Sequence, residues 1–340
     1  MRIGTMLRRR NPGCEVLDVV GTELSPAVRE PDSIYITSLF TWDLDTVTKT
    51  IHFYQDRFPR SRIRVGGIAA SLLPEVVREK TGLKPHVGLL KTAERHPPDY
   101  SLTFGREISA SMTQTTRGCP RRCRFCNVGQ LEPEFAHRGN WKRDVLPQHE
   151  KVILWDNNFL ASPHFPEDCD ELEALGKIVD FNQGLDARLY SPTVAARLSR
   201  IRLRPIRFAF DELSQEKHVL KAIDLARKHS SAEIRVYVLY NFQDTPEDFY
   251  YRVNLLNSRR VLAFPMEYRQ LTDKKTKFPG PHWDSALLRG LKLSLMYYYR
   301  RGMITESRRS FHSIYGRTPK CFIDKLYEIY DYDRSLKRHN

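Results

Sequence analysis

Apolar segments rich in β-branched and aromatic residues alternate with helical segments over residues 108–272, and this alternation constrains the fold most. The strongest segment, Ile234–Tyr240, is followed by Thr245-Pro246, which predicts a helix start because threonine caps helices and proline suits the first helical position. Parallel strands need a crossover connection, usually a helix, so this order predicts parallel βα units. The predicted strands are Ser111–Thr115, Val152–Trp155, Ile178–Asn182, Ile206–Phe210, Ile234–Tyr240 and Val261–Pro265.

Three of the six cysteines lie in one short loop after the first predicted strand. Cys119, Cys123 and Cys126 have the spacing C-x3-C-x2-C, and Phe125 precedes the last of them. A loop of this kind can wrap three thiolates around one face of a cubane iron–sulfur cluster, which more often has four cysteine ligands. Three ligands leave one iron with an open position, and an open position makes a metal site reactive.

Two other interpretations of the cysteine loop stay open: a zinc site with His137 as fourth ligand, and three unrelated thiols. Zinc sites usually pair their ligands in two short arms, and this spacing differs from that pattern. The remaining cysteines, Cys14, Cys169 and Cys321, are far apart and form no second motif. Their distribution argues against a disulfide framework or an auxiliary cluster, and it favours the reducing cytoplasm.

The chain of 340 residues has a formal net charge of +14 at pH 7. This excess favours polyanionic partners such as RNA, and the alternative is a solvated basic surface. No apolar run approaches the ~18–20 residues that cross a bilayer, and the N-terminus differs from a signal peptide. We therefore expect a cytoplasmic protein without a membrane partner. The basic clusters are Arg8–Arg10, Arg121/Arg122/Arg124, Arg300/Arg301 and Arg308/Arg309.

Residues 1–100 form a separate unit with a Rossmann-like pattern. Strands are expected at Ile34–Ser38 and Ile63–Val65, with a helix at Leu44–Phe58 between them. Gly66-Gly67 follows the second strand, and glycine allows close backbone approach to a ligand.

Residues 273–340 are expected to form a basic helical tail after a linker, Lys274–Pro281. The run Tyr297–Arg301 mixes rings with cations, which suits single-stranded RNA or a peptide; the alternative is a core face beside a solvated face. An apolar stripe on the first helix of this tail consists of Leu287, Leu288, Leu291, Leu295 and Tyr298.

The cysteine loop, set at the end of a strand in an alternating α/β region, resembles the radical S-adenosylmethionine (SAM) enzymes. The resemblance implies a partial (βα)6 barrel at residues 108–272, preceded by the small Rossmann-like α/β domain. It implies a 4Fe–4S cluster on Cys119, Cys123 and Cys126, whose open iron binds SAM. One electron then cleaves SAM, and a 5′-deoxyadenosyl radical modifies an unidentified RNA, peptide or small molecule. We expect a reductant of flavodoxin or ferredoxin type.

Polar residues after successive predicted strands are the SAM contacts that this resemblance implies. Asp156 or Asn158 would accept hydrogen bonds from the ammonium of SAM, and Arg188 would pair with its carboxylate. Asp211 would meet the ribose hydroxyls, and the segment containing Asn241 would line the adenine. For each residue the alternative is a helix cap or a turn former. The full set is Asp156, Asn158, Gln183, Asp186, Arg188, Asp211, Asn241 and Phe125.

The resemblance is closest to the branch with an N-terminal cobalamin-binding-type domain. No Asp-x-His-x-x-Gly occurs in the sequence, so the histidine that ligates cobalt in some of these domains has no candidate here. The resemblance still implies cobalamin as a second cofactor, bound without this histidine. The alternative is a vestigial domain that packs against the barrel. Two further functions remain open: a cobalamin-dependent radical SAM methyltransferase, and a non-catalytic zinc-stabilised RNA-binding protein.

Overall fold

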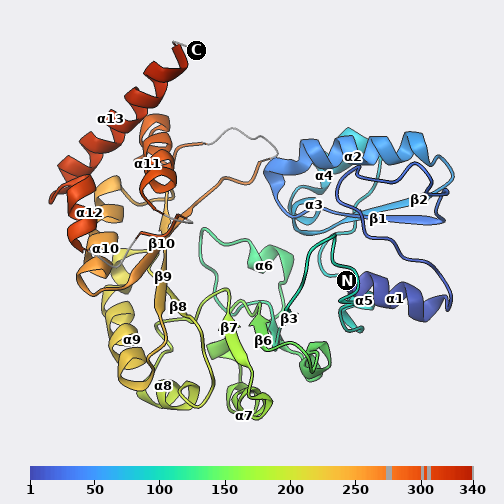
Figure 1. Ribbon diagram of the computed structural model, residues 1–340, viewed down its shortest axis with the longest axis horizontal. Coiled ribbons are helices and arrows are strands. Elements are labelled where there is room, and N and C mark those ends of the chain that lie inside the picture. The colour runs from blue at the N-terminus through green and yellow to red at the C-terminus, as the bar shows by residue number, and fades with distance from the viewer. Residues whose placement is uncertain (273–277, 300–301, 305–307, 339–340) are drawn as a thin grey trace. The chain divides into compact units, whose positions relative to one another are not determined.

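The computed structural model of the chain describes residues 1–272, 278–299, 302–304 and 308–338 (Figure 1). It divides into two compact units. Unit 1 consists mainly of residues 1–113 and 117–150, and unit 2 of residues 114–116 and 151–270 with the described part of residues 277–340.

These units divide the chain differently from the three predicted domains. The segment 117–150, which carries the cysteine loop, groups with the first hundred residues instead of with the other strands of the predicted barrel. The described part of the C-terminal region groups with unit 2. The first half of the predicted linker Lys274–Pro281 and the pair Arg300/Arg301 lie outside the described residues.

A parallel two-stranded sheet forms the centre of the N-terminal part of unit 1. Strands β1 (Ser33–Thr37) and β2 (Arg62–Gly66) are joined by helix α2 (Leu44–Arg57), as predicted (Figure 1). The buried side chains of Ile51 and Val65 belong to one core cluster. The other elements with residues in unit 1 are α1 (Arg2–Arg10), η1 (Thr41–Asp43), α3 (Ile68–Leu72), α4 (Pro74–Thr81), α5 (Lys91–Glu94), β3 (Ala110–Thr113), β4 (Thr116–Arg117), α6 (Val128–Leu131), β5 (Ala136–His137) and η2 (Trp141–Asp144).

The Gly66-Gly67 turn is filled by the protein's own backbone. Gly67 has a φ of +96°, and a Cβ there would lie 2.4 Å from the carbonyl oxygen of Ser38. The Ser38 hydroxyl donates to the Gly66 carbonyl oxygen at 3.0 Å and accepts from the Ala70 N–H at 2.9 Å. Glycine is therefore required by the end of β1, and the close approach that the sequence suggested for a ligand is made by Ser38.

Unit 2 contains five parallel strands within its described part. Strand β6 (Lys151–Leu154) pairs with β7 (Ile178–Phe181), and β9 (Ile234–Tyr240) lies between β8 (Ile206–Ala209) and β10 (Leu262–Glu267). Each predicted strand of the central region overlaps an observed strand, which confirms the mixed α/β class. The described strands form small parallel sheets and no closed barrel.

Helices follow the strands of unit 2 in turn: α7 (Phe165–Leu175), α8 (Pro192–Leu198), α9 (Glu216–His229) and α10 (Pro246–Ser258). Alternate side chains of β9 are buried, as expected for a strand with one face against helices. The predicted cap at Thr245 is confirmed, because its side chain accepts a backbone N–H bond in the first turn of α10, and Ser191 caps α8 in the same way. The apolar stripe of α9 is buried: Val219, Ala222, Ile223 and Ala226.

Three C-terminal helices complete unit 2: α11 (Ser285–Tyr298), α12 (Arg308–Tyr315) and α13 (Pro319–Arg338). Both α12 and α13 contact α10, and aromatic side chains of α10, α12 and α13 pack together. The leucines of the predicted α11 stripe are buried, whereas Tyr298, its last member, is 47% exposed. No helix in the described part of the chain is long and apolar enough to cross a membrane.

Candidate cluster loop and strand-end site

The cysteine loop is closed at its base by residues of unit 1. The Gly118 N–H donates to Glu132 Oε2 at 2.7 Å, and Arg117 forms ion pairs with Glu132 at 3.0 Å and Glu94 at 2.5 Å. Gly118 has a φ of +73°, and a Cβ there would lie 2.2 Å from the Glu134 carbonyl oxygen. Only glycine fits this backbone and this contact. Contacts within the protein therefore hold the two ends of the loop together without a metal.

None of the three cysteines of the loop is in a disulfide with a described residue. Cys119 and Cys123 are half-buried and Cys126 is exposed, while the Cys126 N–H donates to the Cys123 carbonyl oxygen at 3.0 Å. The half-buried Phe125 lies between them in the sequence. The donor set suits a cubane cluster, because three thiolates on one short loop with a fixed base can each reach a different iron.

The described residues contain no preformed site for a single metal ion. Among residues 1–272, 278–299, 302–304 and 308–338, no three Cys, His, Asp or Glu side chains are close enough to hold one ion. The zinc arrangement with His137 as fourth ligand is thus not assembled in the described part of the chain. A cubane binds each thiolate at a different iron, so its ligands need not meet at one point.

Asp156, two residues beyond β6, binds the segment that leads into the cysteine loop. Its Oδ1 accepts hydrogen bonds from the Thr115 N–H at 3.0 Å and hydroxyl at 2.7 Å, and from the Thr116 N–H at 2.6 Å and hydroxyl at 2.8 Å. Its Oδ2 accepts from the same Thr115 N–H at 3.1 Å. Burial raises the pKa of Asp156, and these hydrogen bonds oppose that rise. The carboxylate, predicted to bind the SAM ammonium, fixes the start of the loop.

Three other predicted residues meet at the carboxyl ends of β6 and β7. The Asn158 side-chain amide donates to Asp186 Oδ2 at 3.3 Å, and Arg188 Nε donates to Asp186 Oδ1 at 2.7 Å. The Asn158 side chain is nearly fully buried, and its Oδ1 has no hydrogen-bond partner among the described residues. A buried acceptor without a donor is costly, so this oxygen is suited to receive a ligand's N–H group.

Asp211 follows β8 and belongs to the same electrostatic group. Burial raises its pKa to about 6, and the positive charges of Arg252 and Arg188 and a hydrogen bond from the Leu239 N–H oppose the rise. The charge of Arg188 therefore acts both on Asp186, which it contacts, and on Asp211. A half-buried carboxyl with such a pKa changes charge close to neutral pH.

Arg252 is a structural residue of this site that the sequence reasoning missed. Its guanidinium, fully buried on α10, donates from one nitrogen to the carbonyl oxygens of Phe210 and Asp211, both at 2.8 Å, and from another to Asp244 at 2.6 Å. Burial lowers its pKa, and the charge of Asp244 opposes this. Arginine within the apolar stripe Phe249–Leu256 is the sequence signal that marks it, since a charge there needs buried partners.

Asn241 and Gln183 are placed differently from the group around Asp186. Asn241 has a φ of 67° and gives its side chain to backbone partners: it donates to the carbonyl oxygens of Tyr268 at 3.0 Å and Phe278 at 3.1 Å, and accepts from the Gly280 N–H at 2.6 Å. It therefore ties the end of β9 to later segments. Gln183 is exposed just after β7.

These residues define an α/β protein with a three-cysteine loop and a polar group at the carboxyl ends of parallel strands. Ligands of parallel α/β sheets bind at such strand ends. Comparison with known proteins finds no family model that matches the chain and no curated protein that matches it.

Proposed function

We propose that the chain is a radical SAM enzyme with one 4Fe–4S cluster on Cys119, Cys123 and Cys126. The observation that carries the proposal is the three-cysteine loop, whose leading residues Thr115 and Thr116 are hydrogen-bonded to Asp156 after β6. That position is the ligand-binding edge of a parallel sheet. The finer fold that goes with this function is a partial (βα)6 barrel, of which β6–β10 would form the larger part.

A bound cluster would supply one electron to the sulfonium of SAM, and the side chains of the chain would position SAM. Asn158 Oδ1 is the acceptor best placed for the SAM ammonium, because it is buried and lacks a donor. Arg188 would bind the SAM carboxylate, exchanging part of its contact with Asp186. Asp211 would accept hydrogen bonds from the ribose hydroxyls. Asp156 would act as a positioning residue that holds the start of the cysteine loop.

The test is metal analysis and SAM cleavage on anaerobically reconstituted protein. We expect iron with equimolar sulfide and slow release of 5′-deoxyadenosine after reduction. Replacing any one of Cys119, Cys123 and Cys126 by alanine should remove the cluster. The matched controls are alanine variants of Cys14, Cys169 and Cys321, which should load normally. Full iron content with SAM cleavage in Cys123→Ala would contradict the proposal, and stoichiometric zinc without sulfide would favour the RNA-binding alternative.

A second candidate, a cobalamin-dependent radical SAM methyltransferase, is favoured by one observation in unit 1. Large apolar side chains are exposed directly after β1, at Leu39 and Phe40, and after β2, at Ile68. The carboxyl edge of a parallel sheet is a ligand-binding place, and exposed apolar groups there suit a large cofactor. The turn at Gly67 does not support this candidate further, because the backbone of Ser38 occupies the space beside it. Cobalt that co-purifies with the protein, or saturable binding of added cobalamin, would separate it from the first.

A further inference from the structure

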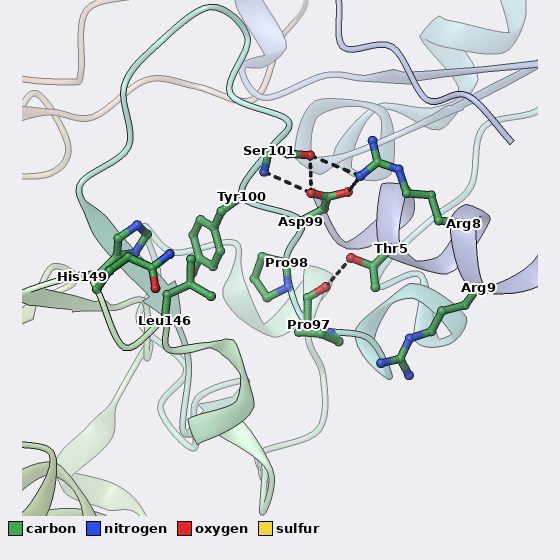
Figure 2. A pocket seen from close by; sticks show the side chains of 11 residues that line it. Thr5, Arg8, Arg9, Pro97, Pro98, Asp99, Tyr100, Ser101, Leu146 and His149 are labelled. Carbon is green, nitrogen blue, oxygen red and sulfur yellow. Dashed lines mark hydrogen bonds and ion pairs between the residues drawn. The ribbon is translucent and has the colours of Figure 1, made fainter. Parts of the chain in front are cut away.

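The end of helix α1 carries arginines beside the segment that follows α5, all within unit 1. Arg2 donates to the His96 carbonyl oxygen at 2.6 Å, and Thr5 donates to the Pro97 carbonyl oxygen at 2.8 Å. Figure 2 shows a further contact between α1 and this segment, the ion pair between Arg8 and Asp99. These contacts fix the direction of α1, so its final turn presents Arg9 and Arg10 at a defined place.

Four arginines from three separated segments lie around His96, and Arg143 contacts the carbonyl of Glu94 beside Arg95; we call them the arginine patch: Arg9, Arg10, Arg95 and Arg143. His96 lies among them. Burial lowers the pKa of His96, and the positive charges of all four arginines lower it further. Their combined field is therefore felt at a single imidazole, as expected for a concentrated positive surface.

Three carboxylates around the arginine patch, Glu94, Asp99 and Asp144, are already held by cations outside the patch. Asp144 is held by Arg2 at 2.5 Å and by Arg138 at 3.2 Å, and Glu94 is held by Arg117. Asp99 is held by Arg8.

Three members of the patch remain without a counter-charge. Arg9, Arg10 and Arg95 are exposed and form no ion pair with any described residue. Arg143, the fourth member, forms an ion pair with Asp144 at 3.9 Å and donates to the Glu94 carbonyl oxygen at 3.1 Å, and both contacts orient its guanidinium. The excess positive charge of this surface is thus available to a partner.

A cleft of about 630 Å³ runs beside the patch and is lined by Arg8, Arg9, Pro97, Tyr100 and His149, among others (Figure 2). Its volume is within the range of ligand-binding clefts. Arginine forks match phosphate oxygens, and exposed arginines spread over three segments suit successive phosphates better than a single anion. We propose that the arginine patch and this cleft bind the sugar–phosphate backbone of a nucleic-acid strand.

The patch is connected to the base of the cysteine loop. Glu94, next to Arg95, pairs with Arg117 at 2.5 Å and approaches Arg2 of α1 at 3.8 Å. A strand on the patch would therefore lie close to the loop that we assign to the cluster. If the proposed function holds, on which this step rests, the substrate class is a nucleotide within such a strand.

The binding test uses short fluorescein-labelled single strands of RNA and of DNA with the same sequence, followed by anisotropy at rising salt. We expect both strands to bind, and neutralising about four phosphates gives a slope of log affinity against log salt of about −3. The double variant Arg9→Gln/Arg95→Gln should lower affinity about tenfold at low salt and reduce the slope by about 1.4. Preference for RNA or DNA identifies the natural strand.

The matched control is Arg78→Gln/Arg259→Gln, which removes the same charge from exposed arginines elsewhere. It should keep affinity within about twofold if binding depends on the patch and not on net charge. Equal losses in both double variants, or no binding of either strand, would overturn the inference. Release of 5′-deoxyadenosine without substrate should be unchanged in the patch variant, so failure of strand binding and failure of the radical chemistry are read separately.

Discussion

Replacing Asp156 should release the start of the cysteine loop from the end of β6. The carboxylate is buried and binds two backbone N–H groups and two hydroxyls of Thr115 and Thr116. Asp156→Ala removes every one of these acceptors and leaves two backbone N–H groups without a partner, at about 1–3 kcal/mol each. We expect a loss of about 4 kcal/mol in the free energy of unfolding. Asp156→Asn keeps one acceptor oxygen and should lose about half of that.

Urea unfolding followed by circular dichroism measures these losses. A double-mutant cycle of Asp156→Asn with Thr116→Val should give a coupling energy of about 1 kcal/mol, because the two side chains share a 2.8 Å hydrogen bond. The control is Asp224→Ala, which removes an exposed ion pair with Arg259 and should change stability by less than about 0.5 kcal/mol. If Asp156→Ala keeps wild-type stability while SAM affinity falls, the carboxylate is a ligand group and our reasoning about the loop is wrong.

Three further predictions follow from single positions. Gly118→Ala should lower cluster loading at least severalfold, since its Cβ meets the Glu134 carbonyl oxygen, whereas Gly139→Ala has open space and should load normally, as iron analysis will show. Gly290→Ala should destabilise the protein by about 1–3 kcal/mol in urea, because its Cβ would lie 2.1 Å from a backbone oxygen of α13; a gain in stability, usual for this change in a helix, would refute the contact. Asp211 has a pKa raised from 3.8 to about 6, so its ionisation costs stability as pH rises through this window. Asp211→Asn should therefore gain about 2–3 kcal/mol relative to wild type between about pH 4 and about pH 7, and a pH-independent difference would contradict the shift.

The strands could be predicted from the sequence because their determinants are local. Runs such as Ile234–Tyr240 combine β-branched and aromatic residues, and the caps at Ser191 and Thr245 bond within their own first turns. Helix α7 also has local determinants. It begins at Phe165 with proline in its first turn and ends before Gly176 in the left-handed region, two signals that were present in the sequence.

The candidate site could be predicted only in part, because its contacts join segments far apart in the chain. The spacing of the cysteines is visible in the sequence, but the partners of Asp156 are 40 and 41 residues away. Asn241 was expected near the adenine, whereas its left-handed backbone and three backbone contacts give it a role in holding segments together. Such pairings depend on tertiary packing, which no local pattern specifies.

The fully buried guanidinium of Arg252 divides the strand-end site into a rigid half and an adjustable half. It binds the backbone after β8 and the side chain of Asp244 after β9. Because its side chain is not exposed, water cannot take the place of either partner. The loops after β8 and β9 therefore keep one spacing whether or not a ligand is present. Arg188 is partly exposed and pairs with Asp186, two residues away in the chain, so water can replace this partner. When a ligand binds, we therefore expect the side chains after β7 to move and the loops after β8 and β9 to keep their positions.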